Sequence, residues 1–350
     1  MKISTNRVHA HRLARNWSQA QLAKRAGISR AAVSAIEGER LSPSVATALA
    51  LAEEFECSVE ELFRPGKASE TSAPQWAWAP RTQSSRYWEA EVGNRRLLYP
   101  VEAVSMNPVP HDGIWEDGIC RERALVPPEM TLTIATCDPA AGLLAAEFAR
   151  ASGFRLLVFP RNGGRALELL QKGLVHIAAL HRSTREHPER NAETVRERLG
   201  RDFQLLHAAK WQEGMALPSD NSSRVAASAA RRTECWAARE PGAGARECLD
   251  ELLEGRRFAG REVQGHASVA EAVRSGWAGA GICVRFSAEE AGLHFLPIRT
   301  ESLEFCFSVR SQRDPRMQAL IRLLRDRSYR RLVSELPGYD ARQTGELISV

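Results

Sequence analysis

The sequence lacks the features that mark secreted, membrane-spanning and disulfide-stabilised proteins. Its 350 residues include seven cysteines, an odd number with no Cys-x-x-Cys pair, and this excludes a disulfide framework. No run approaches the roughly 20 consecutive apolar residues that a membrane-spanning helix needs. The N-terminal stretch MKISTNRVHAHRLARN has no apolar core of the kind found in signal peptides. We therefore expect a cytoplasmic protein with no membrane partner, whose Cys57, Cys248 and Cys306 are reduced core thiols.

Motifs of the common enzyme classes are missing as well. The sequence contains no G-x-S-x-G, P-loop or H-E-x-x-H motif, and Gly242-x-Gly244 lacks the third glycine of a dinucleotide-binding loop. We therefore expect a protein that is not an enzyme and needs no cofactor. Two alternatives stay open: an enzyme that carries a DNA-binding domain, and a C-terminal half that is only a dimerisation scaffold.

What is present predicts a multidomain protein with a mildly basic surface. The hydrophobic fraction of 43% and the charged fraction of 26% are ordinary for a globular chain, and the formal net charge is +5. The chain length suits two or three domains. We expect an all-α domain at 1–65, a linker with a small β-hairpin at 66–128, an α/β domain at 129–312 and a helical segment at 313–350.

Helix-capping residues recur through residues 1–65 and predict five short helices. Ser18 with Gln21 forms a capping box that opens a helix ending near Gly27. Ser29 can cap the next helix, which turns Val33 inward. The remaining caps are Ser42 with Pro43 and Ser58 with Glu61. A helix, a tight turn at Gly27 and a second helix make up the helix-turn-helix arrangement.

The charges of this segment are divided along its length. Up to residue 40 there are eight basic residues: Lys2, Arg7, Arg12, Arg15, Lys24, Arg25, Arg30 and Arg40. Only Glu37 and Glu39 oppose them, and the next acidic group begins at Glu53. A basic front and an acidic back are typical of a module that binds a nucleic-acid duplex.

Residues 7–63, from RVHAHRLARNWSQAQLAKRAGISRAAVSAIEGERL onward, resemble the Xre family of lambda-repressor-like domains. The resemblance implies that Arg12 and Glu37 form an ion pair that locks the first helix to the third. It also implies the residues that contact double-stranded operator DNA: Ser18, Gln19, Ser29, Arg30, Ala31, Ser34 and Arg40. Ser18, Gln19 and Arg40 would contact the phosphate backbone and the others the major groove.

The chemistry of these side chains agrees with the implied roles. The guanidinium of Arg30 can bond to guanine O6 and N7 together, and Ala31 can touch a thymine methyl group. The family often has Glu-Asn-Gly where this chain reads Glu37-Gly38-Glu39, which puts Glu39 close to the expected phosphate path. A helical bundle used only for protein contacts remains the alternative.

Residues 65–85 are rich in Pro, Ser and Ala and are typical of a linker, with Trp76 and Trp78 resting on a neighbouring surface. RYWEAEV and RRLLYPV alternate in polarity on both sides of Gly93-Asn94, which predicts a β-hairpin. Residues 100–128 are expected to be irregular, and we assign them no function.

From Thr131 the pattern alternates between strands and helices, which predicts two α/β lobes with a cleft between them. The expected strands are 131–137, 155–160, 175–181, 234–240, 262–267 and 278–284. The expected helices are 138–151, 163–173, 244–255 and 268–276. In open α/β sheets ligands bind beyond the carboxyl ends of the strands, near helix N-termini.

Four segments in this order resemble the two-lobed type II periplasmic-binding-protein fold, in particular cytoplasmic domains related to molybdate-binding proteins. They are CDPAAGLLA, KWQEGMAL, AREPGAGARECLDELL and the run from His266 to Ile282, followed by ELPGYDARQTGEL. The resemblance covers roughly residues 131–310. Helix-turn-helix proteins with such a domain are ligand-responsive regulators, so it implies a small-molecule effector.

The resemblance places the effector at helix N-termini and in a Gly-rich turn. The implied residues of the first lobe are Thr136, Cys137, Asp138, Asn162, Gly163, Gly164 and His181. Those of the second lobe are Arg239, Gly242, Ala243, Gly244, Ala245, Arg246, His266 and Ser268. The Gly-rich turn allows close backbone approach, and Arg246 can form bidentate bonds to an anion.

Two departures from the family bear on the chemistry of the effector. The family usually has Gly-Ser-Gly-Thr-Arg where this chain has Ala243 and Ala245, so two hydroxyl donors to an oxyanion are lost. Asp138 can cap the first helix with Pro139 at its first position, and its carboxylate repels an anion there. The effector is therefore either an oxyanion such as molybdate or tungstate, or a neutral or zwitterionic metabolite.

Four further side chains suggest a different kind of sensor. Cys137 and Cys283 end expected strands, and His181 and His266 fall near them, so the four can hold copper or zinc or sense oxidants. The alternative is a set of buried thiols and hydrogen-bonded core histidines.

The C-terminal segment and the way the two halves communicate complete the sequence-based hypothesis. PRMQALIRLLRDRSYRRLVSELPG predicts a basic amphipathic helix that covers the effector domain, with Met317, Leu320, Ile321 and Leu324 inward and DNA contact as the alternative. We expect a homodimer in which effector binding closes the lobes and changes the spacing of the paired helix-turn-helix modules.

Overall fold

The computed structural model describes residues 6–15, 17–63, 75–82, 84–102, 110–117, 119–122, 126–219, 235–254 and 259–350. The chain forms two compact units. One comprises residues 1–132 with 148–155 and 313–320, and the other comprises the remaining residues. Among the described residues, no helix has the length and apolar character needed to cross a membrane. The expected domain boundaries stay predictions.

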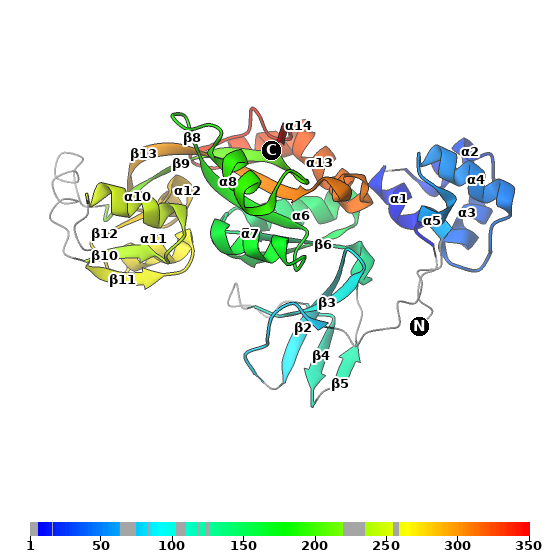
Figure 1. Cartoon of the computed structure of the whole chain (residues 1–350), viewed down its shortest axis with the longest axis horizontal. Helices are drawn as coiled ribbons and strands as arrows, with labels where there is room; N and C mark the ends of the chain where they lie inside the picture. Colours follow the sequence, from blue (N-terminus) through cyan, green and yellow to red (C-terminus); the bar gives the residue numbers. More distant parts are fainter. Residues whose placement is uncertain are drawn as a thin grey trace. The chain divides into compact units, whose positions relative to one another are not determined.

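Five short helices form the N-terminal module, as predicted (blue in Figure 1). They are α1 (Val8–Ala14), α2 (Gln19–Arg25), α3 (Arg30–Glu37), α4 (Val45–Glu54) and α5 (Val59–Phe63). Their core is built from buried side chains that include Leu22, Val33, Ile36, Leu51 and Phe55. Ser18 and Gln21 form both hydrogen bonds of the predicted capping box, and Ser29 caps α3. The capping residues therefore predicted the start of the two central helices correctly.

The predicted cap of the fourth helix is wrong by two residues. Ser44 is the N-cap of α4, because its hydroxyl oxygen accepts a hydrogen bond from the backbone N–H of Thr47 at 3.2 Å. Ser42 and Pro43 precede the helix. The motif Ser-Pro-Ser offers two hydroxyls, and the second is the one placed three residues before a free helical N–H.

A five-stranded sheet follows in the first unit. Its strands are β1 (Gln75–Trp76), β2 (Ser85–Val92), β3 (Arg95–Pro100), β4 (Gly113–Glu116) and β5 (Ile119–Glu122), in the order β1-β3-β2-β4-β5. The predicted hairpin is β2–β3, and Trp76 and Trp78 pack edge-on against Tyr87 and Tyr99. The stretch 100–128 was expected to be irregular, but it contains the antiparallel pair β4–β5. Each strand has only four residues, the shortest length over which alternation indicates a strand.

The second unit is built on a ten-stranded sheet with the path β11-β10-β12-β9-β13-β8-β6-β7, and β14 and β15 pair with β9. The strands are β6 (Thr131–Thr136), β7 (Arg155–Pro160), β8 (Ile177–Thr184), β9 (Phe203–Leu217), β10 (Trp236–Arg239), β11 (Gly260–Val263), β12 (Ala280–Val284), β13 (His294–Ser308), β14 (Tyr339–Asp340) and β15 (Leu347–Ser349). The helices are α6 (Ala141–Ser152), α7 (Gly163–Gln171), α8 (Arg190–Leu199), α10 (Gly244–Leu252), α11 (His266–Arg274), α12 (Arg285–Glu290), α13 (Pro315–Arg325) and α14 (Arg327–Ser334).

The sheet divides this unit into two lobes joined by two long strands (Figure 1). We call β6–β8 with α6–α8 the first lobe, and β10–β12 with α10–α12 the second lobe. β9 and β13 are each 15 residues long, pair antiparallel along their whole length and contribute to both lobes. These two strands were not predicted.

Three helix boundaries differ from the sequence-based expectation. α6 begins at Ala141 rather than Asp138, because the Asp138 carboxylate accepts the N–H of Ala140 and makes a turn before the helix. α11 begins at His266, so His266 lies in a helix and not at a strand end. The expected C-terminal helix is two helices, because Asp326 caps a second one, α14. Met317, Leu320, Ile321 and Leu324 are buried, as predicted.

Candidate functional site

The exposed face of α3 holds the residues expected to read DNA. Ser29, Arg30 and Ala31 are exposed in the first turn of α3, while Val33 and Ile36 of the same helix are buried. Ser34 is half-buried, and its hydroxyl accepts a hydrogen bond from Arg40. The caps and the inward apolar residues thus orient a polar face toward solvent, which is the geometry that major-groove contact requires.

A buried ion pair holds this face in place. Arg12 of α1 donates to both carboxylate oxygens of Glu37 at 2.6 and 3.0 Å, as the family resemblance implied. Gln19 was expected to contact a phosphate, and its amide donates to Glu37 instead, at 2.9 Å. Ser18 is exposed at the start of α2. Glu39 follows with a φ of +56°, a left-handed conformation that turns the chain after α3.

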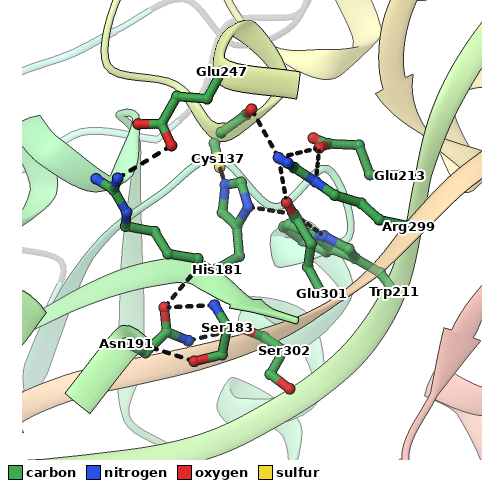
Figure 2. A network of polar contacts seen from close by, with 12 residues as sticks. Cys137, His181, Ser183, Asn191, Trp211, Glu213, Glu247, Arg299, Glu301 and Ser302 are labelled. Atoms are coloured by element: carbon green, nitrogen blue, oxygen red, sulfur yellow. Dashed lines mark hydrogen bonds and ion pairs between the residues drawn. The ribbon is translucent and has the colours of Figure 1, made fainter. Parts of the chain in front are cut away.

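The second unit contains a buried network of charged side chains centred on His181 (Figure 2). His181 stands on β8, and Trp211 and Glu213 stand on β9, while Arg299 and Glu301 stand on β13. Residues that alternate along the two long strands point to the same face of the sheet. The pairing of β8, β13 and β9 therefore brings these side chains together.

Glu301 is the central acceptor of this network. One carboxylate oxygen lies 2.6 Å from Nδ1 of His181 and also accepts the indole N–H of Trp211 at 3.0 Å. The other oxygen lies 2.8 Å from Nη2 of Arg299. Glu301 and His181 are 1% and 4% exposed. A charge removed from water to this degree requires partners on every side, and Glu301 has them.

Arg299 joins a second carboxylate to the network. Its Nη2 lies 2.8 Å from Glu213 and also donates to the backbone carbonyl of Gly244 at 3.0 Å. Burial and the negative charge of Glu301 raise the pKa of Glu213 to about 8, although Arg299 acts in the opposite direction. Two carboxylates that share one guanidinium thus differ in their affinity for a proton.

Cys137 touches the other side of the His181 ring. Its Sγ lies 3.2 Å from Nε2 of His181, just after the end of β6. Burial alone would raise the pKa of the Cys137 thiol, but the charges of His181 and Arg239 outweigh it and lower that pKa. Burial would lower the pKa of His181, yet Cys137 and Glu301 raise it well above the ordinary value. The Cys137 thiol and the His181 imidazole thus each favour the charged form of the other.

His266 lies on the far side of this group at the start of α11. Its ring centroid is 6.3 Å from that of His181 and 5.9 Å from that of Trp211. It is 1% exposed, and neither ring nitrogen makes a hydrogen bond with any residue that the structure describes. Burial, reinforced by the charges of Arg239 and His181, lowers the pKa of His266 well below its ordinary value, so the ring is neutral.

Asp138 and Tyr339 close one edge of the site. The Tyr339 hydroxyl donates to the Asp138 carboxylate at 2.6 Å, and the Tyr339 ring packs against Trp211. Burial raises the pKa of Asp138, while the bonds from Tyr339 and Ala140 act against this rise. Thr136 is buried, and its hydroxyl accepts the backbone N–H of Asp138.

A second set of contacts joins residues from the two lobes. Asn162 caps α7, and its amide donates to Glu240 at 3.2 Å. Glu240 in turn binds the buried guanidinium of Arg239 through both oxygens. A Cβ atom added to Gly244 would lie 2.7 Å from the His181 ring, so only glycine fits there without displacing the ring. The Gly-rich turn therefore approaches the His181 ring closely.

The remaining expected ligand residues have other surroundings. Arg246 binds Asp250 and Glu262, so its guanidinium is not free for an anion, contrary to expectation. Ser268 lies on the exposed face of α11. Gly163 and Gly164 begin α7, and Gly242 and Ala243 directly precede α10. Ala245 packs in the core of the second lobe.

Cys283 was expected beside Cys137, and this expectation is wrong. Its side chain is buried in the apolar cluster of the second lobe that includes Val269 and Ala288. Burial raises the pKa of its thiol to about 12. The strand β12 alternates, and Cys283 falls on the face that α11 and α12 cover.

The sequence-based reasoning missed the acidic residues of the network. Glu213 lies in KWQEGMAL and Tyr339 in ELPGYD, two segments that carried the family resemblance, so their neighbourhood was singled out. Glu301 had a weaker signal, an acidic residue that precedes the strand pattern SLEFCF. A carboxylate inside an apolar strand is the pattern that can identify such residues.

Known protein families match both the N-terminal and the C-terminal half of the chain. A helix-turn-helix family model matches residues 8–62, and the structure of these residues is of the Xre type. The model of the PBP superfamily domain matches residues 145–325, slightly more than half of the chain. The chain therefore belongs to the PBP superfamily, with a helix-turn-helix domain at its N-terminus.

Individual relatives are distant. The uncharacterized protein YvgK of Bacillus subtilis is 27% identical over 189 residues, which are 51% of this chain and 61% of that protein, so the chain spans less than two thirds of its length. An ABC-type phosphate transport receptor from Vibrio cholerae is similar with a TM-score of 0.40 and 13% identity, over 60% of this chain and 99% of that one. The effector-binding domain of QuiR in complex with shikimate gives a TM-score of 0.39 and 12% identity, over 54% and 95%.

Proposed function

We propose that the protein is a ligand-responsive, one-component transcriptional regulator and not an enzyme. Its helix-turn-helix binds operator DNA, and its PBP-like domain binds a small molecule in the region of the His181 network. The observation that carries the proposal is the face of α3, with Ser29, Arg30 and Ala31 exposed to solvent, in the same chain as a PBP-like fold. This role places the protein in the cytoplasm, where the DNA is.

The buried charges support an effector site in the second unit. A buried network of ionisable side chains costs stability and is seldom retained for packing alone. Arg246 is neutralised and Asp138 adds a carboxylate, so the anion-binding groups expected for an oxyanion are not free. We therefore favour a ligand other than molybdate or tungstate.

A homodimer is part of the proposal because helix-turn-helix proteins read two half-sites. The module exposes apolar side chains in and beside α4: Leu41, Val45 and Leu49, of which Val45 is 78% exposed. Contiguous exposed apolar residues mark protein–protein contacts. This surface is our candidate for the contact between two copies.

The test of DNA reading is a substitution in α3. The full chain selects a preferred duplex from a random pool, and its affinity for that duplex is then measured by fluorescence anisotropy. Arg30→Ala should weaken binding by about 5- to 150-fold, the equivalent of about 1–3 kcal/mol for one bidentate base contact. The control is Arg274→Ala, which removes an exposed arginine of α11.

The control variant should bind the duplex with unchanged affinity. If Arg30→Ala also binds it normally, α3 does not read DNA and the proposed function fails.

A further inference from the structure

Three donor atoms of the kind that soft metals prefer lie together in the second unit. They belong to Cys137, His181 and His266, and all lie within 4.8 Å of one another. The closest pair is Sγ of Cys137 and Nε2 of His181, at 3.2 Å. Around a tetrahedral zinc ion, with bonds of about 2.0–2.3 Å, ligand atoms are about 3.5 Å apart. Small side-chain rotations therefore suffice to bring the three atoms onto one ion.

His266 supplies an independent reason to expect a ligand here. Its imidazole is buried, and both nitrogens lack a hydrogen-bond partner among the described residues. A buried polar group without a partner costs free energy, and such a group in a folded protein calls for an explanation. A metal bond to one nitrogen supplies the missing partner.

The surroundings of His181 match those of a metal ligand. Its Nδ1 is held by Glu301 at 2.6 Å, which leaves Nε2 directed at Cys137. A carboxylate behind a ligating histidine fixes the ring and increases its affinity for the metal. The neighbouring group of His181, Glu213 and Glu301 is different, because the Arg299 guanidinium already sits on both carboxylates.

The positive charge of Arg239 near the site does not prevent cation binding. Glu240 binds its guanidinium through two hydrogen bonds of 2.9 and 3.0 Å. The pair is therefore close to neutral as a unit, and the Cys137 thiolate becomes the dominant charge at the site when the metal displaces its proton.

We propose that Cys137, His181 and His266 bind a thiophilic d¹⁰ metal ion, Zn²⁺ or Cu⁺, with one further position open to water or a small ligand. Thiolate and imidazole ligands select these ions over Mg²⁺ and Ca²⁺. Cys137 and His181 belong to the first lobe and His266 to the second, so the ion ties the two lobes together. The ion thereby serves as effector; this part rests on the proposed function, whereas metal binding itself does not.

Metal binding is tested on the full chain after chelator treatment under reducing conditions. Co²⁺ reports a zinc-type site through thiolate-to-cobalt charge transfer in the near ultraviolet, and Zn²⁺ should displace it. Cu⁺ is supplied without oxygen in competition with a chromogenic chelator. The two arms identify which ion the site prefers.

The variants are chosen so that the fold survives. His266→Ala removes a side chain that has no hydrogen-bond partner among the described residues, and it should weaken binding at least tenfold with an unchanged circular dichroism spectrum. Cys137→Ser should abolish the charge-transfer band. The matched control, Cys235→Ser, alters a cysteine outside the cluster and should bind as the parent chain does. The proposed metal site would be contradicted if His266→Ala bound the metal as tightly as the parent chain, or if the parent chain bound neither Zn²⁺ nor Cu⁺.

A second readout separates this inference from the proposed function. The affinity for the selected duplex is measured with and without the preferred ion, for the parent chain and for His266→Ala. A change in the parent alone supports the ion as effector. If the ion binds and the DNA affinity does not change, the effector assignment fails. Loss of DNA binding under every condition would instead contradict the proposed function.

Discussion

The approach of Gly244 to His181 shows how one residue couples the two lobes. Gly244 begins α10 in the second lobe, and its carbonyl accepts a hydrogen bond from Arg299. Its missing side chain leaves room for the imidazole of His181, which stands on β8 in the first lobe. The backbone of one lobe thus lies directly on the charged centre of the other.

Gly244→Ala should therefore disturb the site. The added methyl group meets the His181 ring at 2.7 Å, and overpacking of this kind costs about 1–3 kcal/mol. The free energy of unfolding in urea measures this cost. In the control, Gly142→Ala, the new methyl group meets no described atom within 4 Å beyond its chain neighbours and its own helix backbone, and the substitution should be neutral or slightly stabilising. Equal stability of both variants would contradict the tight contact.

Glu213 predicts a particular dependence of stability on pH. Its pKa is about 8 in the folded protein against 4.5 ordinarily, so the folded state holds this proton more tightly than the unfolded state. The contribution of Glu213 to stability is complete below pH 4.5 and is lost as the pH rises toward 8. Glu213→Gln removes this loss.

Urea unfolding of both proteins across this pH range measures the effect. The variant should gain stability relative to the parent as the pH rises from 4.5 to 8. A difference that is independent of pH would show that Glu213 has an ordinary pKa.

At the scale of the element, an ion pair joins α1 to α3, the helix that we propose reads DNA. The side chains of Arg12 and Glu37 are only 10% and 6% exposed, whereas those of Arg25 and Glu54 are 53% and 28% exposed. Loss of one member of a buried pair leaves the other charge without a partner.

Glu37→Ala should lower the opening free energy of α3 by about 3–5 kcal/mol, whereas Glu54→Ala should cost about 0–1 kcal/mol. Hydrogen exchange at the amides of α3 measures both. If the two substitutions have the same small effect, the ion pair does not hold the helix.

The elements differ in how well the sequence predicts them. Ser18 and Ser29 identified α2 and α3 because a cap is a local hydrogen bond between near neighbours. β9 and β13 gave no comparable signal, since each runs through both lobes and meets a different environment at each end. Two register shifts in their pairing further interrupt the alternation that identifies a strand.

The proximity of Cys137 and His181 was predictable from their positions along the chain, whereas the contacts that depend on strand pairing were missed. Cys137 directly follows β6 and His181 lies within β8, the strand that pairs with β6, so the order of the strands along the chain placed them together. Glu301 reaches His181 across a separation of 120 residues, through the pairing of β13 with β8. The residues next to Glu301 in the sequence do not determine which residues of β8 it pairs with. The residues next to Cys283 likewise do not determine which face of β12 is covered by helices.

At the scale of the whole molecule, the chain combines a helix-turn-helix module with a two-lobed PBP-like unit. The lobes share one sheet, and β9 and β13 are the only long strands that contribute to both among the described residues. A ligand held by side chains of both lobes favours the closed arrangement by its difference in affinity for the two states. In our account this closure changes the spacing of the two DNA-reading modules of a dimer.

The most direct test is the affinity for the selected duplex, measured with the full chain in the presence and absence of a compound that raises its melting temperature. Zinc, cuprous ion, oxyanions and metabolites form the panel from which that compound is chosen. We predict a change in DNA affinity of about tenfold, within the range of about 5- to 150-fold that allosteric coupling commonly spans. An affinity that is identical with and without the bound compound would contradict the claim that this protein is a ligand-responsive regulator.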